Sequence, residues 1–211
     1  MPEGPEIWIL SEAINKFYHC EKTRAYGKHL FIFKKAEEKS GENWSFGLTG
    51  KVQVLDNGEI IKMHSGWIYG DKIACQNYDE EIQKLGTNWL TGSEADLRKE
   101  VDSWVTSKKK LAALMLDQSK ISGIGVAWGS EILFKALLRP DIRACDQDLN
   151  NLVTSMIEIR EKIKQIYSEQ VDESNCRDFI NKWFENLYQV RSMNKYKKGS
   201  KLEVLGRSWW V

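Results

Sequence analysis

The sequence predicts an α+β protein with a β-rich first half and a helical second half. Between Thr23 and Cys75, aromatic and β-branched residues form short runs divided by turn signals such as Asp56-Asn57-Gly58. From Glu94 to Asn186, apolar residues recur at helical spacing. After Tyr188 the pattern returns to β character.

The chain opens with Met1-Pro2-Glu3-Gly4-Pro5-Glu6, which predicts the start of a helix. Pro5 fits the first helical position because its φ is preset and it lacks an N–H that would be unpaired there. The apolar face of this helix is expected to comprise Ile7, Ile9, Leu10, Ala13, Ile14 and Phe17.

The next segments are expected to be antiparallel strands of a small sandwich or barrel. They cover residues 23–33 (interrupted by Gly27-Lys28), 44–55, 59–63 and 67–75, with a hairpin loop at 36–42. Gly47 and Gly50 suggest bulges in the second of these strands.

Thr91-Gly92-Ser93 is interpreted as a linker, with Ser93 capping the first helix of the second half. The helices are expected at 94–106, 108–117, 127–138, 148–170 and 176–186. A final β region is predicted at 187–193 and 202–211, around a Lys/Gly turn at 194–200. The predicted domains are therefore 1–90, 91–186 and 187–211.

Composition limits the classes of function. The 211-residue chain is 42% hydrophobic, without an apolar run long enough to span a membrane and without a visible signal peptide. The four cysteines, Cys20, Cys75, Cys145 and Cys176, are far apart and form no CxxC or Cys/His cluster. We interpret them as reduced, buried thiols of an intracellular, non-secreted protein without a metal site.

Basic residues concentrate near the end of the chain. Residues 191–211 contain six lysines and arginines against one acid, and Lys108-Lys109-Lys110 forms a second cluster. Such patches suit a polyanionic partner, although a lysine run is also typical of a solvated face.

The first residues also carry chemistry. If Met1 is removed, Pro2 presents a secondary α-amine, and such an amine titrates at about 8, well below a lysine. The nearby carboxyl groups of Glu3 and Glu6 complete the equipment for Schiff-base formation at a carbonyl carbon. The alternative is an ordinary helix start rich in Pro and Glu.

Three separated stretches together indicate a family. They are residues 2–6, residues 116–134 with Ser122-Gly123-Ile124-Gly125-Val126, and the terminal Gly206-Arg207-Ser208-Trp209-Trp210-Val211. In these motifs and their order the chain resembles the formamidopyrimidine-DNA glycosylase / endonuclease VIII family. The resemblance implies a β-sandwich domain, a helix–two-turn–helix domain and a DNA-binding cleft between them.

The resemblance also implies catalytic roles. Pro2 would be the nucleophile that attacks the sugar, Glu3 would assist ring opening and proton transfer, and Glu6 would support the local network. Lys28, in Gly27-Lys28-His29-Leu30-Phe31, matches the family's strand lysine and would contact phosphate and act as an acid. Without the motif, Lys28 would be interpreted as a surface lysine.

The Gly123–Gly125 turn suggests a phosphate contact, because glycines let backbone N–H groups approach an anion at a helix N-terminus. A glycine-containing turn between helices is also common without any ligand. Val126 occupies the position at which the family usually has a phosphate-binding Asn. Glu131 keeps the family's acid and is expected to brace the motif.

The C-terminal hairpin resembles the family's finger but lacks its four zinc-binding cysteines, so we expect a zincless finger with neither metal nor cofactor. Arg207 would bind phosphates at the lesion. Trp209 and Trp210 are expected to pack the hairpin rather than stack on bases.

Two further positions depart from the family pattern. Leu48 corresponds to the void-filling residue; it can wedge into a base stack or belong to the core. The segment at Gly70–Ala74 lacks the usual intercalating Arg, and Lys72 is a weak substitute.

The resemblance thus predicts a monomeric base-excision-repair enzyme, a DNA glycosylase and AP lyase that removes oxidised bases through a Schiff base on Pro2 and β,δ-elimination. The alternatives are an AP lyase alone or a non-catalytic protein that binds damaged DNA. The partner would be damaged double-stranded DNA, with single-stranded DNA left open. The preferred lesion is also open, with a lean towards oxidised pyrimidines.

Overall fold

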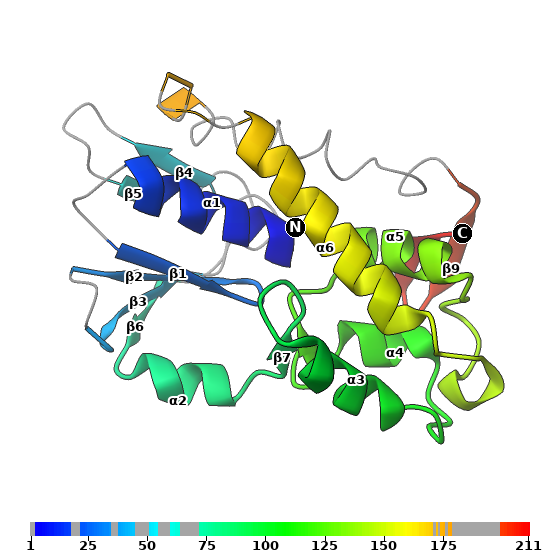
Figure 1. Cartoon of the computed structure of the whole chain (residues 1–211). Helices are drawn as coiled ribbons and strands as arrows, with labels where there is room; N and C mark the ends of the chain where they lie inside the picture. Colours follow the sequence, from blue (N-terminus) through cyan, green and yellow to red (C-terminus); the bar gives the residue numbers. More distant parts are fainter. Residues whose placement is uncertain are drawn as a thin grey trace.

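The computed structural model describes residues 3–17, 22–34, 38–44, 51–54, 60–63, 72–170 and 199–211, with single positions between 172 and 178. Helices and antiparallel strands are combined as the sequence predicts (Figure 1). Strands β1 to β6 lie in the first part of the chain and helices α2 to α6 in the second.

A four-stranded antiparallel sheet organises the first part. Its order is β1-β2-β3-β6, with the bounds Lys22–Tyr26 (β1), His29–Phe33 (β2), Gly41–Trp44 (β3) and Lys72–Cys75 (β6). Side chains alternate between its faces, as strand geometry requires. Leu30 and Ile32 join the core that contains helix α1, whereas Phe31 and Phe33 pack with Tyr78 of helix α2.

Helix α1 (Gly4–Phe17) buries its expected apolar face against this sheet. Ile7, Leu10 and Ile14 are 0% exposed. A second antiparallel pair, β4 (Lys51–Val54) with β5 (Ile60–Met63), lies on the same side of the sheet as α1 (Figure 1). The predicted turn at 56–58 joins these two strands but lies outside the described residues.

Two of the predicted strands are wrong in extent. The expected single strand over 23–33 is a hairpin, because Gly27 has a φ of +57° and the chain reverses so that Tyr26 pairs with His29. The expected strand over 44–55 is divided between β3 and β4, which belong to different sheets.

The described residues of the second part contain five α-helices and a short parallel strand pair. The bounds are α2 (Tyr78–Gln83), β7 (Thr87–Asn88), α3 (Glu94–Asp102), α4 (Leu111–Leu116), β8 (Ile121–Ser122), α5 (Val126–Ala136), a 3-10 turn (Ala144–Asp146) and α6 (Leu152–Gln170). The sequence predicted α3 to α6 to within a few residues at each end, but it missed α2 and the β7–β8 pair.

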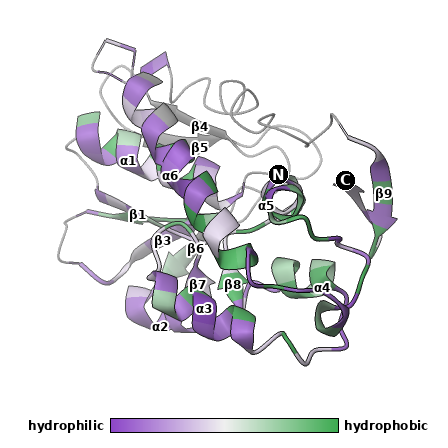
Figure 2. Ribbon diagram, turned by 45° about the vertical axis from the view of Figure 1, so that its right-hand side comes forward, coloured by the Kyte–Doolittle hydropathy of each residue, from purple (hydrophilic) through white to green (hydrophobic). Residues whose placement is uncertain are grey.

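Local signals explain these helix ends. Ser93 caps α3 as expected, since its side chain accepts the N–H of Asp96. Asn77 caps the unpredicted α2 in the same manner, through the N–H of Asp79. Helix α4 is entirely apolar and green in Figure 2, whereas α2 and α3 are mostly purple, which fits the deeper burial of α4.

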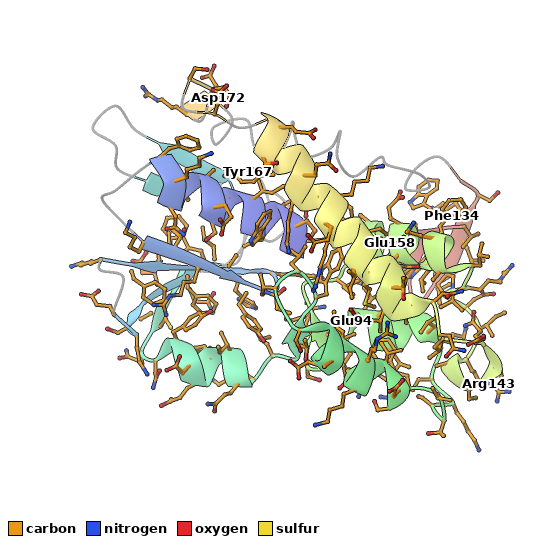
Figure 3. The ribbon with its side chains drawn as sticks, viewed as in Figure 1. Glu94, Phe134, Arg143, Glu158, Tyr167 and Asp172 are labelled. Carbon is orange, nitrogen blue, oxygen red and sulfur yellow. The ribbon has the colours of Figure 1, made fainter. Side chains whose placement is uncertain are left out.

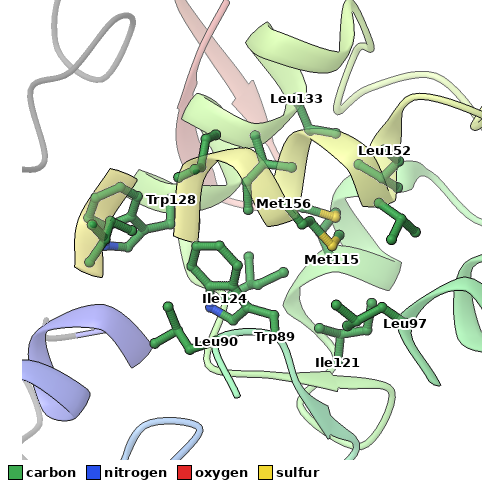
Figure 4. Close-up of a cluster of buried hydrophobic side chains, with 14 of the residues drawn as sticks. Trp89, Leu90, Leu97, Met115, Ile121, Ile124, Trp128, Leu133, Leu152 and Met156 are labelled. Carbon is green, nitrogen blue, oxygen red and sulfur yellow. The ribbon is translucent and has the colours of Figure 1, made fainter. Parts of the chain in front are cut away.

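One continuous cluster of buried apolar side chains runs from α1 to the C-terminal hairpin. Trp89, Ile124 and Trp128 lie together in it, beside Met115 and Met156 (Figure 4). The cluster crosses the expected boundary between residues 90 and 91, so the division into domains stays a prediction.

Helix α6 also connects the two halves. Its Tyr167 packs edge-on against Trp8 of α1, with 5.6 Å between the ring centroids (Figure 3). Arg160 donates to the backbone oxygen of Gly92 at 2.8 Å and of Trp89 at 3.3 Å. The predicted linker is therefore held against α6.

The C-terminal hairpin consists of β9 (Lys201–Val204) and β10 (Arg207–Trp210). The predicted single strand over 202–211 is wrong, because Leu205 and Gly206 both have a positive φ and reverse the chain. Trp209 is 0% exposed and packs on α5, which confirms its expected structural role, while Trp210 is partly buried.

The expected burial of the cysteines is confirmed for one of the two that the structure describes. Cys75 is buried, but Cys145 is exposed, because it lies in the 3-10 turn at the surface; Cys20 and Cys176 lie outside the described residues. So do the strand expected at 187–193 and most of the helix expected at 176–186. Among the described helices, none combines the length and the apolar character needed to cross a membrane.

Candidate active site

The start of the chain is docked on the first turn of α5. The carboxylate of Glu3 accepts the backbone N–H groups of Gly125, Ala127 and Trp128, each at 3.0 Å. Glu3 is only 6% exposed. A helix N-terminus carries unpaired N–H groups and a partial positive charge, so a carboxylate is a favourable occupant.

Glu6 fixes the same segment from within α1. Its carboxylate accepts the backbone N–H of Glu3 at 2.8 Å and the indole N–H of Trp128 at 3.1 Å. Glu6 is 2% exposed. Both acids of the motif are therefore buried and hydrogen-bonded to the start of α5. Glu3 binds backbone N–H groups there, and Glu6 binds the side chain of Trp128.

Close backbone packing explains the glycines on both sides of this junction. The N–H of Gly4 donates to the oxygen of Gly123 at 2.7 Å, and a Cβ on Gly4 would lie 2.9 Å from that oxygen. A Cβ on Gly125 would lie 2.3 Å from the carboxyl carbon of Glu3. Position 123 also requires glycine for its backbone conformation, because its φ is +95°.

The Gly27-Lys28 turn reaches the same place. A Cβ on Gly27 would lie 3.0 Å from Cβ of Ser122, and one on Gly123 would lie 3.4 Å from Cα of Gly27. Lys28 is partly buried at this turn and makes interactions of its own. The fold thus brings the first residues, the lysine turn and the glycine turn together from three distant parts of the sequence.

Gln118 lies within the motif at residues 116–134, but the sequence analysis gave it no role. Its amide nitrogen donates to the oxygens of Leu116 at 3.0 Å and Ile124 at 2.9 Å, and its amide oxygen accepts the N–H of Gly123 at 2.9 Å. It therefore braces the glycine turn from inside. The sequence signal that could have identified this role is an amide side chain within the motif, because Gln can donate and accept hydrogen bonds at the same time.

The amides of the glycine turn, which were expected to contact a phosphate, have partners within this chain. The N–H of Gly123 is taken by Gln118 and the N–H of Gly125 by Glu3. The amide of Gly125 therefore helps to dock the chain start, the amide of Gly123 holds the turn together, and both glycines also permit close packing. Val126 is the first residue of α5 and is partly buried.

The remaining predicted site residues are spread more widely. Glu131 lies in α5, is 0% exposed and has interaction partners, as a bracing residue should. Arg207 is exposed at the first position of β10. The backbone of Lys72 pairs with Trp44, and its side chain is not described. Pro2 and Leu48 lie outside the described residues.

The titration of His29, the neighbour of Lys28, is shifted. Burial lowers the pKa of His29, and nearby Lys28 acts in the same direction, while the hydrogen bond to Asn43 and the charge of Glu81 oppose them. The Nδ1 atom of His29 lies 3.0 Å from Oδ1 of Asn43. Among the described residues, no three His, Cys, Asp or Glu side chains gather as a metal site would require.

Comparison with known sequences finds similar proteins that carry the same name. The chain is 25% identical over 151 residues to the formamidopyrimidine-DNA glycosylase of Shewanella oneidensis. The alignment covers 69% of this chain and 54% of that protein. It is 27% identical over 152 residues to that of Shewanella sp. strain W3-18-1, with the same coverage. The chain thus spans about half the length of these relatives. No model of a protein family matches it.

Comparison with solved structures gives the fold. The Fpg (MutM) protein of Thermus thermophilus superposes with a TM-score of 0.75 at 16% identity, covering 99% of this chain and 96% of the other. Fpg of Lactococcus lactis, bound to DNA that contains an AP site, gives 0.68 at 15% identity, with 99% and 97% covered. The resemblance indicated by the motifs and the predicted mixed fold are both confirmed.

Proposed function

Because the chain is related to the formamidopyrimidine-DNA glycosylases in sequence and shares their fold, we propose that it is a DNA-repair glycosylase. The proposal extends to an AP lyase activity on the same site, to damaged double-stranded DNA as the partner, and to action as an intracellular monomer. It covers base removal and strand cleavage by one enzyme.

In the proposed mechanism the α-amine of Pro2 attacks the sugar carbon that carries the damaged base. The base departs with the bonding electrons and a proton, the sugar ring opens, and the amine is left in a Schiff base. Loss of a sugar proton then expels the phosphate on one side, and a second elimination expels the other. The target base must leave the helical stack for this attack.

The docking of the chain start carries this proposal. Three N–H groups hold the side chain of Glu3, and Glu6 holds its backbone N–H at 2.8 Å. The residue that follows Pro2 is therefore fixed at both its main chain and its side chain. A nucleophile gains rate when its attack geometry is preorganised, which supports Pro2 as the reacting group and Glu3 as its proton-transfer partner.

Lys28 and Arg207 are proposed as phosphate-binding residues. The Gly27-Lys28 turn packs against Ser122 and Gly123, next to the chain start, which favours Lys28 as the contact nearest to the reacting sugar. Arg207 is exposed and charged, as a residue that meets DNA should be. Binding should weaken steeply with salt, because these contacts replace counterions on the DNA.

The test is borohydride trapping of the Schiff base on three duplexes, which contain an abasic site, thymine glycol or 8-oxoguanine. The protein is used after mass spectrometry has verified that Met1 is absent. Trapping on an oxidised base would support glycosylase and lyase activity together and identify the lesion class. A Pro2→Gly variant should trap far less, and undiminished trapping would contradict the assignment of Pro2.

A lyase without base removal is the second candidate. Val126 replaces the side chain that would help to hold DNA, and the segment around Lys72 carries no intercalating Arg. Trapping only on the abasic duplex would favour this candidate. Absence of trapping on all three duplexes, with binding retained, would leave a protein that only recognises damaged DNA.

A further inference from the structure

Two leucines occupy a backbone conformation that leucine avoids. Among the described residues, Leu137 (φ +59°) and Leu205 (φ +56°) are the non-glycine positions with a positive φ. They are also 87% and 56% exposed. The left-handed region is normally left to Gly or Asn, and an exposed leucine gains little from burial. Leu137 is the left-handed C-cap of α5, so the end of the helix accounts for its conformation. No such role accounts for a leucine at position 205.

Leu205 lies next to a cation at the tip of the C-terminal hairpin. Arg207 pairs with Val204 directly after the turn at Leu205 and Gly206. The alternation of the strand places Arg207 on the same face as Trp209, the face that packs on α5. The hairpin tip therefore combines an exposed positive charge with an exposed apolar side chain.

The acid of the hairpin is already neutralised. Glu203 accepts from Lys201 at 2.9 Å and from the hydroxyl of Ser208 at 2.6 Å. Residues 191–211 contain six basic residues against this one acid. The electrostatic character of the tip thus favours a polyanion.

The last residues of the hairpin run along α5 towards the C-terminal end of that helix. Cζ3 of Trp209 lies 2.9 Å from the position of a Cβ on Gly129, and the N–H of Trp210 donates to Oγ of Ser130 at 3.1 Å. Val211 then borders a cavity of about 140 Å³ that Leu137 also lines, at the C-terminal end of α5. Leu205 is not among the residues that line this cavity.

We propose that Leu205 is an apolar DNA-contact residue, which packs against sugars and base edges beside the phosphate that Arg207 binds. This inference rests on the proposed function. Proteins that bend or open DNA commonly combine a phosphate-binding cation with an apolar wedge. The backbone strain at Leu205 is then retained because glycine or asparagine would remove the apolar contact.

The test compares two substitutions that relieve the same strain at different places. Leu205→Asn and Leu137→Asn should each raise the melting temperature by about 2 to 4 °C, because Asn tolerates the left-handed region. Affinity is measured by fluorescence anisotropy with a labelled duplex that contains a tetrahydrofuran abasic analogue. We expect Leu205→Asn to weaken binding about fivefold, as partial loss of a leucine contact predicts.

Two further variants make the result decisive. Leu137→Asn should bind like the wild type, and Leu205→Met should retain most of the affinity because its side chain stays apolar. Leu205→Gly, which fits the turn without strain, should repeat the loss seen with Asn. Wild-type affinity in both Leu205→Asn and Leu205→Gly, or an equal loss in Leu137→Asn, would overturn the inference.

Failure of the proposed function would look different. A wild-type protein that binds neither the abasic duplex nor an undamaged one would overturn both proposals together. Salt-sensitive binding by the wild type with no dependence on residue 205 would leave the proposed function standing and reject only the contact by Leu205.

Discussion

The two ends of the described chain both pack on α5, but by different means. The start of the chain is held at the first turn of the helix by hydrogen bonds to Glu3 and Glu6 in a buried setting. The C-terminal hairpin is held one turn later, mainly by the ring of Trp209 against Gly129. The first attachment is polar and directional, and the second depends on shape.

This difference teaches how each end can serve a reaction. Buried hydrogen bonds to a carboxylate fix both distance and angle, and they are costly to leave unmade. Such rigidity suits a segment that carries a nucleophile. The ring of Trp209 holds one part of the hairpin on α5, while the tip at Leu205 and Arg207 stays exposed and able to meet a ligand.

The largest expected effect is that of Gly125→Ala, which breaks the first attachment. Gly125 has φ −124° and ψ −167°, which alanine can adopt, so the glycine is required by space alone. The added Cβ would lie 2.3 Å from the carboxyl carbon of Glu3 and would displace it from three N–H groups. We expect a loss of about 3 to 5 kcal/mol in the free energy of unfolding and near-complete loss of trapping.

Denaturant unfolding and borohydride trapping check this prediction. Gly206→Ala serves as the control for a glycine change, because within the described part of the chain no atom lies within 4 Å of the added Cβ and the positive φ opposes it. Its cost should be roughly 1 kcal/mol. A Gly125→Ala protein as stable and as active as the wild type would show that Glu3 is not held as described.

The next effect in size is that of Trp128→Phe. The ring stays apolar, but Oε1 of Glu6 loses the indole N–H at 3.1 Å inside the core. Loss of a hydrogen bond to a buried carboxylate costs about 1 to 3 kcal/mol, which thermal unfolding can measure. Trp89→Phe is the matched control, because the Nε1 atom of Trp89 has no hydrogen-bond partner among the described residues. Equal losses in both variants would argue that ring packing alone matters.

A smaller effect is expected for Gly129→Ala, which tests the second attachment. Alanine favours the helix by about 1 kcal/mol, while the added Cβ lies 2.9 Å from the Trp209 ring and overpacks the contact at a cost of about 1 to 3 kcal/mol. The net change in unfolding free energy should be about 1 kcal/mol. Intrinsic tryptophan fluorescence should change, and salt-dependent DNA binding should weaken, whereas trapping at saturating DNA should persist.

Loss of trapping at saturating DNA in Gly129→Ala would contradict the division of roles between the two attachments. It would mean that the hairpin, like the chain start, determines the geometry of the reaction. Ser130→Ala provides a milder version, since it removes only the acceptor of the Trp210 N–H.

The smallest effect concerns pH. Burial lowers the pKa of His29 below its ordinary value, so the unfolded chain binds its proton more readily than the folded one. This contribution to stability is present above about pH 6.5 and is lost as the pH falls through the lowered folded-state pKa. His29→Gln should therefore lose less stability than the wild type between pH 7.5 and 5.5 in urea titrations. Parallel pH profiles would show that His29 does not titrate as inferred.

The sequence predicted those parts of the fold in which local pattern and tertiary packing agree. The apolar faces of α1 and α4, the Ser93 cap and the burial of Trp209 follow from residue type and spacing. It failed where a turn depended on φ at one or two residues. Gly27 was interpreted as an interruption within one strand rather than as a reversal, and leucine at position 205 carries no turn signal.

For the site, the motifs identified Glu3, Glu6 and Lys28, and the structure gathers their segments at the glycine turn. The direction of the hydrogen bonds could not be read from sequence. The glycine-turn amides had two possible acceptors, a phosphate or a carboxylate of this chain, and only the fold shows that Glu3 takes one of them. The roles of these residues in catalysis remain predictions.

The most direct test of the central claim is to locate the covalent bond. The borohydride-trapped complex with an abasic duplex would be digested, and the peptide joined to DNA would be sequenced by mass spectrometry. We predict that the sugar is attached to the nitrogen of Pro2 in the peptide that begins with Pro2-Glu3-Gly4. Attachment at Lys28 or at another lysine would contradict the claim that the docked chain start is the nucleophile.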